Sequence, residues 1–190
     1  KIMAFFFEPF PTVQYDVKKN NKLEVLTNIT VRFRIQEVLA NRTVVAYDYN
    51  VKENERPDVI AYKYYDDQTL VWIILLTNNI INPNFDWPLD NASLQRFIKD
   101  KYGSINSAKN TVHHYEQIIR ESSTRFDGSV IPRKTVWVDE DTYNTLSADE
   151  RILVTQYDFE EELNDDKRQI KILDRKYVSN IVNEVETIFE

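Results

Sequence analysis

The stretch RPDVIAYKYYDDQTLVWIILLTNN, residues 56–79, decides the fold because it predicts two short helices with a sharp break between them. Pro57 suits the first helical turn, where its missing N–H has no helical partner, and Asp58 suits the positive end of the helix dipole. Residues 68–77 are apolar nearly all round, so the second helix is expected to be buried on most sides. The pair Asn78-Asn79 ends it.

Strands and a further helix are predicted on either side of this stretch. Residues 43–49 are rich in β-branched and aromatic side chains, which is typical of a strand. Residues 29–35 alternate between apolar and polar, which indicates another strand, although residues 36–39 could instead extend a helix. After Trp87, Asn91 is a predicted cap for a helix over residues 92–102.

The second half of the chain predicts more strands and a terminal helix. Strands are expected over residues 111–119, 135–138 and 169–173, and Asp127-Gly128 indicates a hairpin. The end of the chain has helical periodicity, and its apolar stripe comprises Val178, Ile181, Val182, Val185, Ile188 and Phe189. Such a stripe packs either on the core of its own chain or on a partner.

These elements predict an α+β fold in three parts. The first, residues 1–42, is an extended arm and linker. The second, residues 43–103, contains the paired helices. The third, residues 104–190, is a mixed α+β region that ends in the helix.

The composition is compatible with protein–protein contacts and argues against phosphate-binding loops and cysteine-based sites. Only two of the 190 residues are glycine, which disfavours the glycine-rich loops that hold phosphates. There is no cysteine, so disulfides and thiolate metal sites are excluded. Aromatic residues make up 13% of the chain and suit either protein interfaces or an aromatic core. The longest apolar run, residues 70–76, is far shorter than a membrane span.

Charge is unevenly distributed along the chain. The net charge is −7, which disfavours nucleic acid as a partner. Residues 139–166 hold eleven acidic side chains and one arginine, so this segment alone carries −10. It is either a solvated surface or a patch that steers a basic partner.

No motif predicts catalysis, a cofactor or a metal site. The chain contains no P-loop, G-x-G-x-x-G, G-x-S-x-G or H-E-x-x-H sequence. The only histidines, His113 and His114, are neighbours in a predicted strand and should therefore point to opposite faces. We expect one exposed and one buried histidine rather than a chelating pair.

The first residues predict an arm that docks on another surface. Its aromatic side chains are Phe5, Phe6, Phe7 and Phe10, and the prolines beside them favour extended backbone. An exposed apolar patch of this kind usually marks a contact, unless the arm folds back on its own domain.

The segment Tyr47–Trp87 resembles a LysM module, whose plan is β-α-α-β with an asparagine-rich turn after the second helix. Asp58 stands where that family often has its helix-opening aspartate. Two features depart from the pattern. Arg56-Pro57 replaces the usual glycine, and no closing strand is evident after Trp87 because a helix is predicted there. The sugar-binding loops of the family lie at these two places.

A narrower resemblance extends over both ends of the chain. It is similar to a baseplate wedge protein with a LysM-like domain from T4-like contractile-tailed phages. The matching residues are Phe5-Phe6-Phe7-Glu8-Pro9, Arg56-Pro57-Asp58, Ala61, Tyr64, Leu70, Trp72, Leu75, Asn78-Asn79, Asp86-Trp87 and Arg168-Gln169-Ile170-Lys171-Ile172.

This resemblance implies a non-enzymatic clamp in the tail baseplate of a virion, assembled in the host cytoplasm. Its partners would be other wedge proteins and hub-proximal tail proteins, in copies arranged with sixfold symmetry. The expected partner-binding residues are Phe5, Phe6, Phe7, Phe10, Trp87, Ile181, Val185, Ile188 and Phe189. The alternative is a LysM-type module that binds peptidoglycan glycan, for which Asp86 and Trp87 are the expected contacts.

Overall fold

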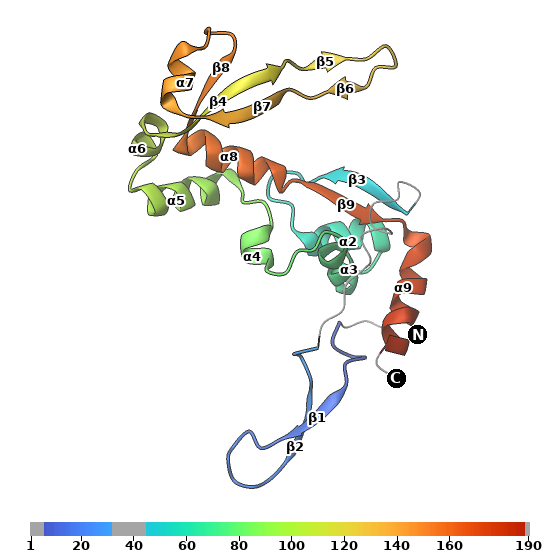
Figure 1. The fold of residues 1–190 in the computed structure, drawn as a ribbon. Coiled ribbons are helices and arrows are strands. Elements are labelled where there is room, and N and C mark those ends of the chain that lie inside the picture. Colours follow the sequence, from blue (N-terminus) through green and yellow to red (C-terminus); the bar gives the residue numbers. More distant parts are fainter. Residues whose placement is uncertain (1–5, 32–44, 189–190) are drawn as a thin grey trace. The chain divides into compact units, whose positions relative to one another are not determined.

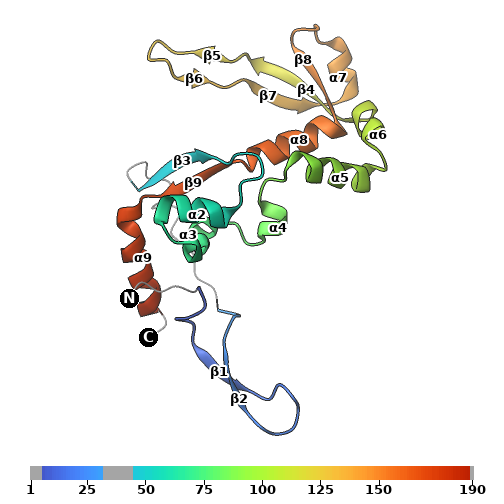
Figure 2. The ribbon, with the colours of Figure 1, turned by 180° about the vertical axis from the view of Figure 1, so that it is seen from behind.

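The computed structural model describes residues 6–31 and 45–188, which form α-helices and small antiparallel sheets. The chain divides into two compact units (Figures 1 and 2). The first unit combines the chain up to Pro88 with the residues from Lys167 onward, and the second is the continuous segment Leu89–Asp166. The predicted α+β class is confirmed.

The first unit is built on a two-stranded sheet whose strands are far apart in sequence. β3 (Ala46–Asn50) pairs antiparallel with β9 (Gln169–Leu173) along its whole length. Alternate residues of a strand share a face, so Ile170 and Ile172 are buried together against the helices. The strand predicted over residues 169–173 is confirmed.

Two consecutive helical segments pack against this sheet, as the opening stretch predicted. α2 (Pro57–Tyr65) begins at its proline, and α3 (Val71–Thr77) follows a short 3-10 turn, η1 (Gln68–Leu70). The side chain of Asp67 accepts the N–H of Thr69 at 2.8 Å and so caps η1. The fully buried side chains of these helices are Ile60, Ala61, Ile73 and Ile74.

The terminal helix closes the same core. α9 (Arg175–Ile188) begins three residues before the predicted stripe. Its buried side chains, Val178, Val182 and Val185, join the cluster formed by β9 and the paired helices. The described part of the stripe, Val178 to Val185, therefore packs on the core of its own chain. A short helix, α4 (Pro83–Asp86), leads from the asparagine-rich turn to Trp87.

The chain before β3 contains a hairpin where the sequence predicted an extended arm. β1 (Thr12–Tyr15) pairs antiparallel with β2 (Glu24–Thr27). The strand predicted over residues 29–35 is wrong at its start, where Ile29 and Thr30 form a turn; residues 32–35 lie outside the described part. The Asn28 side chain accepts the N–H of Thr30 at 3.1 Å, and this local bond favours a turn over a strand.

Helices and a small sheet make up the second unit. Its helices are α5 (Asn91–Tyr102), α6 (Ile105–Asn110), α7 (Glu140–Thr145) and α8 (Gln156–Asp166). The cap of α5 is Asp90, whose side chain accepts the N–H of Ser93 at 2.9 Å, so the predicted cap Asn91 is the first helical residue instead. The small apolar core of this unit comprises Leu94, Ile98 and Ala108.

The sheet of the second unit has the order β7-β4-β8, with both neighbours antiparallel to β4. Its strands are β4 (Val112–Arg120), β7 (Lys134–Val138) and β8 (Arg151–Thr155). A narrow hairpin of β5 (Ser123–Thr124) and β6 (Val130–Ile131) lies between β4 and β7 in sequence and extends beyond them (Figure 1). The hairpin predicted at Asp127-Gly128 is confirmed.

The compact units divide the chain differently from the predicted parts at 42/43 and 103/104. The first cut lies at Pro88, before α5 rather than after it, and the last 24 residues return to the first unit. The reason is the pairing of β3 with β9, which brings the end of the chain back to the paired helices.

Candidate partner-binding surfaces

The phenylalanines near the start of the chain mostly face inward. Phe10 is buried, and Phe6 packs on the core with its ring centroid 5.7 Å from that of Trp72. The rings of Phe6, Phe7 and Phe10 also contact one another. Only Phe7 is largely exposed, at 49%, while Phe5 lies outside the described residues. This part of the arm therefore folds back on its own domain and leaves one aromatic ring for a partner.

Trp87, an expected contact residue, belongs to the core of the first unit. Its side chain is 8% exposed, and its indole Nε1 donates to the carbonyl of Glu55 at 2.9 Å. The neighbouring Asp86 accepts the N–H of Asn82 at 2.9 Å and so stabilises the turn before it. Because both side chains serve the fold, their arrangement does not favour the glycan-binding alternative.

The carboxylate of Glu55 organises the loop between β3 and α2. It accepts hydrogen bonds from the hydroxyl of Tyr49 at 2.7 Å, from the N–H of Lys52 at 3.1 Å and from the ammonium of Lys63. Burial alone favours the neutral acid, but these donors outweigh it and lower the pKa of Glu55. The charged carboxylate is thus a structural centre of this loop.

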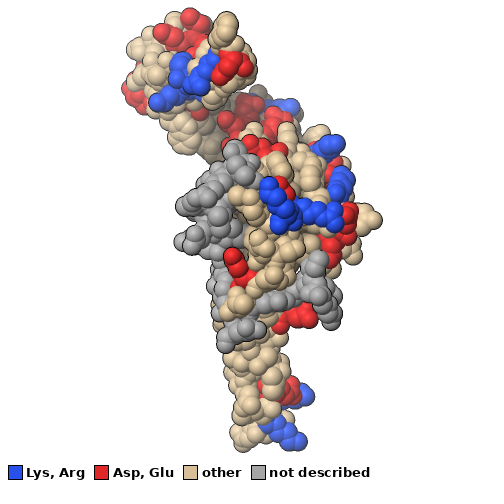
Figure 3. Space-filling model, turned by 90° about the vertical axis from the view of Figure 1, so that its right-hand side faces the viewer, with Lys and Arg blue, Asp and Glu red and all other residues tan. Residues whose placement is uncertain are grey.

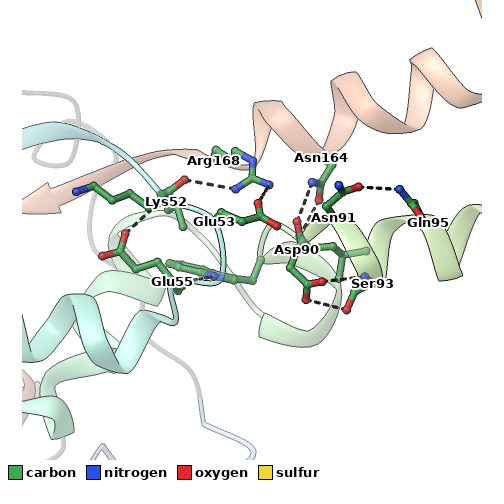
Figure 4. Close-up of polar contacts among 12 residues, drawn as sticks. Lys52, Glu53, Glu55, Asp90, Asn91, Ser93, Gln95, Asn164 and Arg168 are labelled. Atoms are coloured by element: carbon green, nitrogen blue, oxygen red, sulfur yellow. Dashed lines mark hydrogen bonds and ion pairs between the residues drawn. The ribbon is translucent and has the colours of Figure 1, made fainter.

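An arginine at the start of β9 ties that strand to the same loop. Arg168 donates to Glu53 at 2.8 Å and to the carbonyl of Val51 at 3.5 Å (Figure 4). Residues from both segments of the first unit therefore hold this loop in place. Its polar side chains stabilise the fold of the unit.

The predicted contact residues of the terminal helix are also used inside the chain. Val185 is buried, and Ile181 is half-buried against the core. Ile188 ends α9, but its side chain and Phe189 lie outside the described part. The described face of the helix therefore leaves little apolar surface for a partner helix.

The β1–β2 hairpin carries the exposed apolar surface that sequence reasoning missed. Its exposed apolar side chains, with those of the turn that follows, are Val13, Tyr15, Val17, Leu23, Val25, Leu26 and Ile29. Alternation places Val13 and Tyr15 on one face, with Leu26 directly opposite Val13. The other face is mostly polar, with Thr12, Gln14 and Thr27. The alternation within residues 12–15 was the available signal.

The loop of this hairpin is ordered by its own polar groups. The carboxylate of Asp16 accepts the backbone N–H of Asn20 at 3.0 Å and that of Asn21 at 2.6 Å. Lys18 also forms an ion pair with Glu24 at 3.1 Å. The hairpin therefore presents its apolar face on a defined turn.

The acidic segment 139–166 is spread over α7, β8 and α8 rather than forming one simple patch. Glu160 is buried and accepts hydrogen bonds from Lys101 at 2.6 Å and from the hydroxyl of Tyr102 at 2.7 Å. By contrast, Glu161 and Glu162 are exposed on the same helix. Only part of the segment's charge is thus presented to solvent.

The two histidines lie together, and the expectation that they point to opposite faces is wrong. β4 has a bulge against β8 between Val112 and His114, which inserts one extra residue and removes the alternation at His113. The two Nδ1 atoms are 2.8 Å apart, and Nε2 of His114 lies 3.0 Å from Oε1 of Glu116. The ring of His113 stacks on Phe159, with centroids 3.8 Å apart.

Such a pair has a defined protonation requirement. An Nδ1···Nδ1 hydrogen bond needs one protonated and one bare nitrogen, so the two rings cannot both be cations in this arrangement. Burial, and then the neighbouring charge of His114, lower the pKa of His113 below its ordinary value of 6.5. The cluster is thus a packing element between β4 and α8 that can carry at most one positive charge on its two joined imidazoles.

Within the described residues, no group of three or more histidine, aspartate or glutamate side chains is placed to hold a metal ion. Across the same residues, none of the helices has the length and apolar character needed to span a bilayer.

Comparison with known proteins gives the family. The family model described as base plate wedge protein 53 matches residues 2–188. A curated relative, baseplate wedge protein gp53 of Enterobacteria phage T4, is 24% identical over 193 residues, covering 97% of this chain and 94% of the relative. The match spans both compact units and the exposed hairpin. The chain therefore belongs to the base plate wedge protein 53 family, a structural and non-enzymatic component of the phage tail baseplate.

Proposed function

We propose that this protein is a clamp that joins baseplate wedges to each other and to hub-proximal tail proteins, in several copies with sixfold symmetry. Membership of the wedge family supports the location of this clamp in the tail baseplate. The fold supports the proposal in a second way. It combines a rigid core with the β1–β2 hairpin, which is too small to bury its own apolar side chains.

The rigid part of the clamp is a LysM-like core with an insertion. β3, α2, α3 and β9 follow one another in the order strand, helix, helix, strand. In this proposal β9 serves as the closing strand, and the second compact unit lies in sequence between α3 and β9. This arrangement supports a LysM-like scaffold that holds proteins.

The observation that carries the clamp proposal is the exposed apolar face of the β1–β2 hairpin. A two-stranded hairpin is marginally stable in water, because it has too few neighbours to bury its side chains. Here Tyr15 is 61% exposed, and the facing pair of Val13 and Leu26 is exposed as well. Burying such side chains contributes about 1.5–3 kcal/mol each, so a partner surface would stabilise the hairpin and gain affinity from it.

The termini are the second part of the proposed clamp. Phe7 remains exposed beside a buried aromatic cluster, so among the described phenylalanines near the start of the chain it is the one best placed to meet a partner. The exposed acids of α8 would set register against a basic surface more than affinity, because exposed charges act mainly through steering. Phe5, Ile188 and Phe189 stay proposed contacts on the basis of the sequence alone.

The test compares two hairpin variants, one with three substitutions on the apolar face and one with two on the opposite face. The first replaces the apolar face with Val13→Thr, Tyr15→Thr and Leu26→Thr; the second replaces Gln14→Thr and Val25→Thr on the other face. Threonine keeps strand propensity in both. We expect both proteins to have wild-type circular dichroism, and only the first to leave wedges unjoined when baseplates are separated by sedimentation. Normal baseplate yield from the first variant would remove the hairpin from the proposal.

A further inference from the structure

The tip of the β5–β6 hairpin holds a phenylalanine in a defined turn. Gly128 donates its N–H to the carbonyl of Arg125 at 3.0 Å, and Arg125 donates to the carbonyl of Ser129 at 2.8 Å. Gly128 has φ +82°, the left-handed conformation that closes three-residue hairpin loops. Asp127 accepts the N–H and the hydroxyl of Ser129 at 2.9 and 2.6 Å. Phe126 stands at the apex of this braced turn.

Phe126 contributes nothing visible to the packing of its own unit. Its relative exposure is 111%, the highest among the exposed large apolar residues of the described chain. A polar residue would serve the turn equally well, and an exposed phenylalanine on a rigid support is the form that an interface anchor takes before it binds. Pre-organisation lowers the entropy cost of placing the ring in a pocket.

The hairpin around this ring is basic in an otherwise acidic protein. Residues 120–134 contain four basic and two acidic side chains, a net charge of +2 in a chain of −7. Glu121 is paired with Arg133 at 3.1 Å, while Asp127 is occupied by the turn. This leaves three further bases, Arg120, Arg125 and Lys134. Arg125 is the chain neighbour of Phe126, whereas Arg120 and Lys134 lie opposite each other where β4 pairs with β7. Figure 3 shows lysine and arginine side chains together with aspartate and glutamate side chains on the second unit.

We propose that Phe126 is an anchor that inserts into an apolar pocket bordered by carboxylates on another baseplate protein. The ring supplies the buried contact, and the remaining bases of the hairpin, Arg120, Arg125 and Lys134, meet the acidic border. Nucleic acid is a poorer match because the chain as a whole carries a net charge of −7. This contact is distinct from the β1–β2 hairpin and the termini. It can therefore be tested independently of the clamp surfaces proposed above.

The first experiment identifies the partner at this position. The full chain, carrying the photo-reactive p-benzoylphenylalanine in place of Phe126, is supplied to cells infected by a phage that lacks the natural gene. Finished baseplates are irradiated, and the adduct is mapped by mass spectrometry. We expect one adduct, to another baseplate protein, at a peptide rich in aspartate or glutamate. An adduct to a second copy of this chain, an adduct to nucleic acid, or no adduct in finished baseplates overturns the proposal.

The second experiment measures the affinity and association rate of this chain for the partner that the cross-link identifies. Phe126→Ala is expected to weaken binding by at least roughly thirty-fold, the loss typical of an interface hot spot, whereas Phe126→Leu retains most of the affinity. The double variant Arg125→Glu, Lys134→Glu should slow association and remove its dependence on salt. A change of less than about twofold for Phe126→Ala overturns the anchor.

A matched pair at Gly128 tests whether the turn itself matters. An added Cβ at Gly128 meets no atom within 4 Å, so a substitution acts only through the positive φ. Gly128→Ala is therefore expected to weaken binding although Phe126 is unchanged, and Gly128→Asn, a residue that tolerates this conformation, should restore much of it. Equal affinity for all three proteins contradicts the pre-organised anchor.

Discussion

The carboxamide of Asn78 binds both backbone polar groups of Lys171, 93 residues later in the chain. Its Nδ2 donates to the Lys171 carbonyl at 2.8 Å, and its Oδ1 accepts the Lys171 N–H at 2.7 Å. These are the two bonds that a neighbouring strand would make, so the side chain at the end of α3 satisfies β9 on the edge away from β3. The asparagine turn thereby fastens the closing strand to the paired helices.

Removing this side chain should therefore loosen β9. Asn78→Ala leaves two backbone groups of Lys171 without these bonds, and we expect the free energy of unfolding to fall by roughly 2–4 kcal/mol. Amide exchange at Lys171 should accelerate in parallel. The control is Asn79→Gly at the adjacent exposed position with φ +54°, where glycine fits the backbone and little change is expected. Unchanged exchange at Lys171 in Asn78→Ala would show that the pairing is unimportant.

Substitution of Trp87 should affect stability rather than recognition. Trp87→Phe removes the indole bond to Glu55 and part of a buried ring, at an expected cost of about 1–3 kcal/mol in urea unfolding. The neighbouring Phe85 is exposed, so Phe85→Ala should stay within about 0.5 kcal/mol of the natural protein. A Trp87→Phe protein of full stability that fails to join baseplates would restore this residue as a partner contact.

Asn164 should hold together the two ends of the second unit. Its Oδ1 accepts the N–H of Leu89 at 2.7 Å, and its Nδ2 donates to the Leu89 carbonyl at 3.0 Å (Figure 4). Because Asn164 is buried, Asn164→Ala should cost roughly 2–4 kcal/mol in the unfolding of this unit. Asn164→Asp should rescue little, since its second oxygen faces a carbonyl. Glu161→Ala, on the exposed side of the same helix, is the control.

The histidine pair should make the second unit sensitive to mild acid. The pKa of His113 is lowered in the folded protein, so its contribution to stability is present above pH 6.5 and is lost as the pH falls through the folded pKa. We expect a lower melting temperature and faster amide exchange along β4 on acidification below pH 6.5. His113→Phe keeps a ring against Phe159 and should show a smaller loss. Equal pH dependence in both proteins would assign the effect to other groups.

The sequence by itself determined the local structure of the first unit well. Proline at position 57 and the apolar run to Thr77 specify the paired helices, because both act within a few residues of chain. The alternation in residues 169–173 likewise specifies a strand. In the second unit, Asp127-Gly128 specifies a hairpin for the same local reason. The absence of catalytic motifs was also readable directly, and it agrees with the family.

Only the tertiary structure decided what those elements do. The sequence around β3 and β9 does not identify them as paired strands. An alternating pattern determines which face of a strand is buried, but not which distant strand supplies its hydrogen bonds. That pairing joins the two segments of the first unit into one core, in which Trp87 and Val185 are buried. The exposed apolar surface lies instead on the β1–β2 hairpin. The bulge that joins His113 to His114 likewise depends on the register between two strands, which composition and spacing cannot encode.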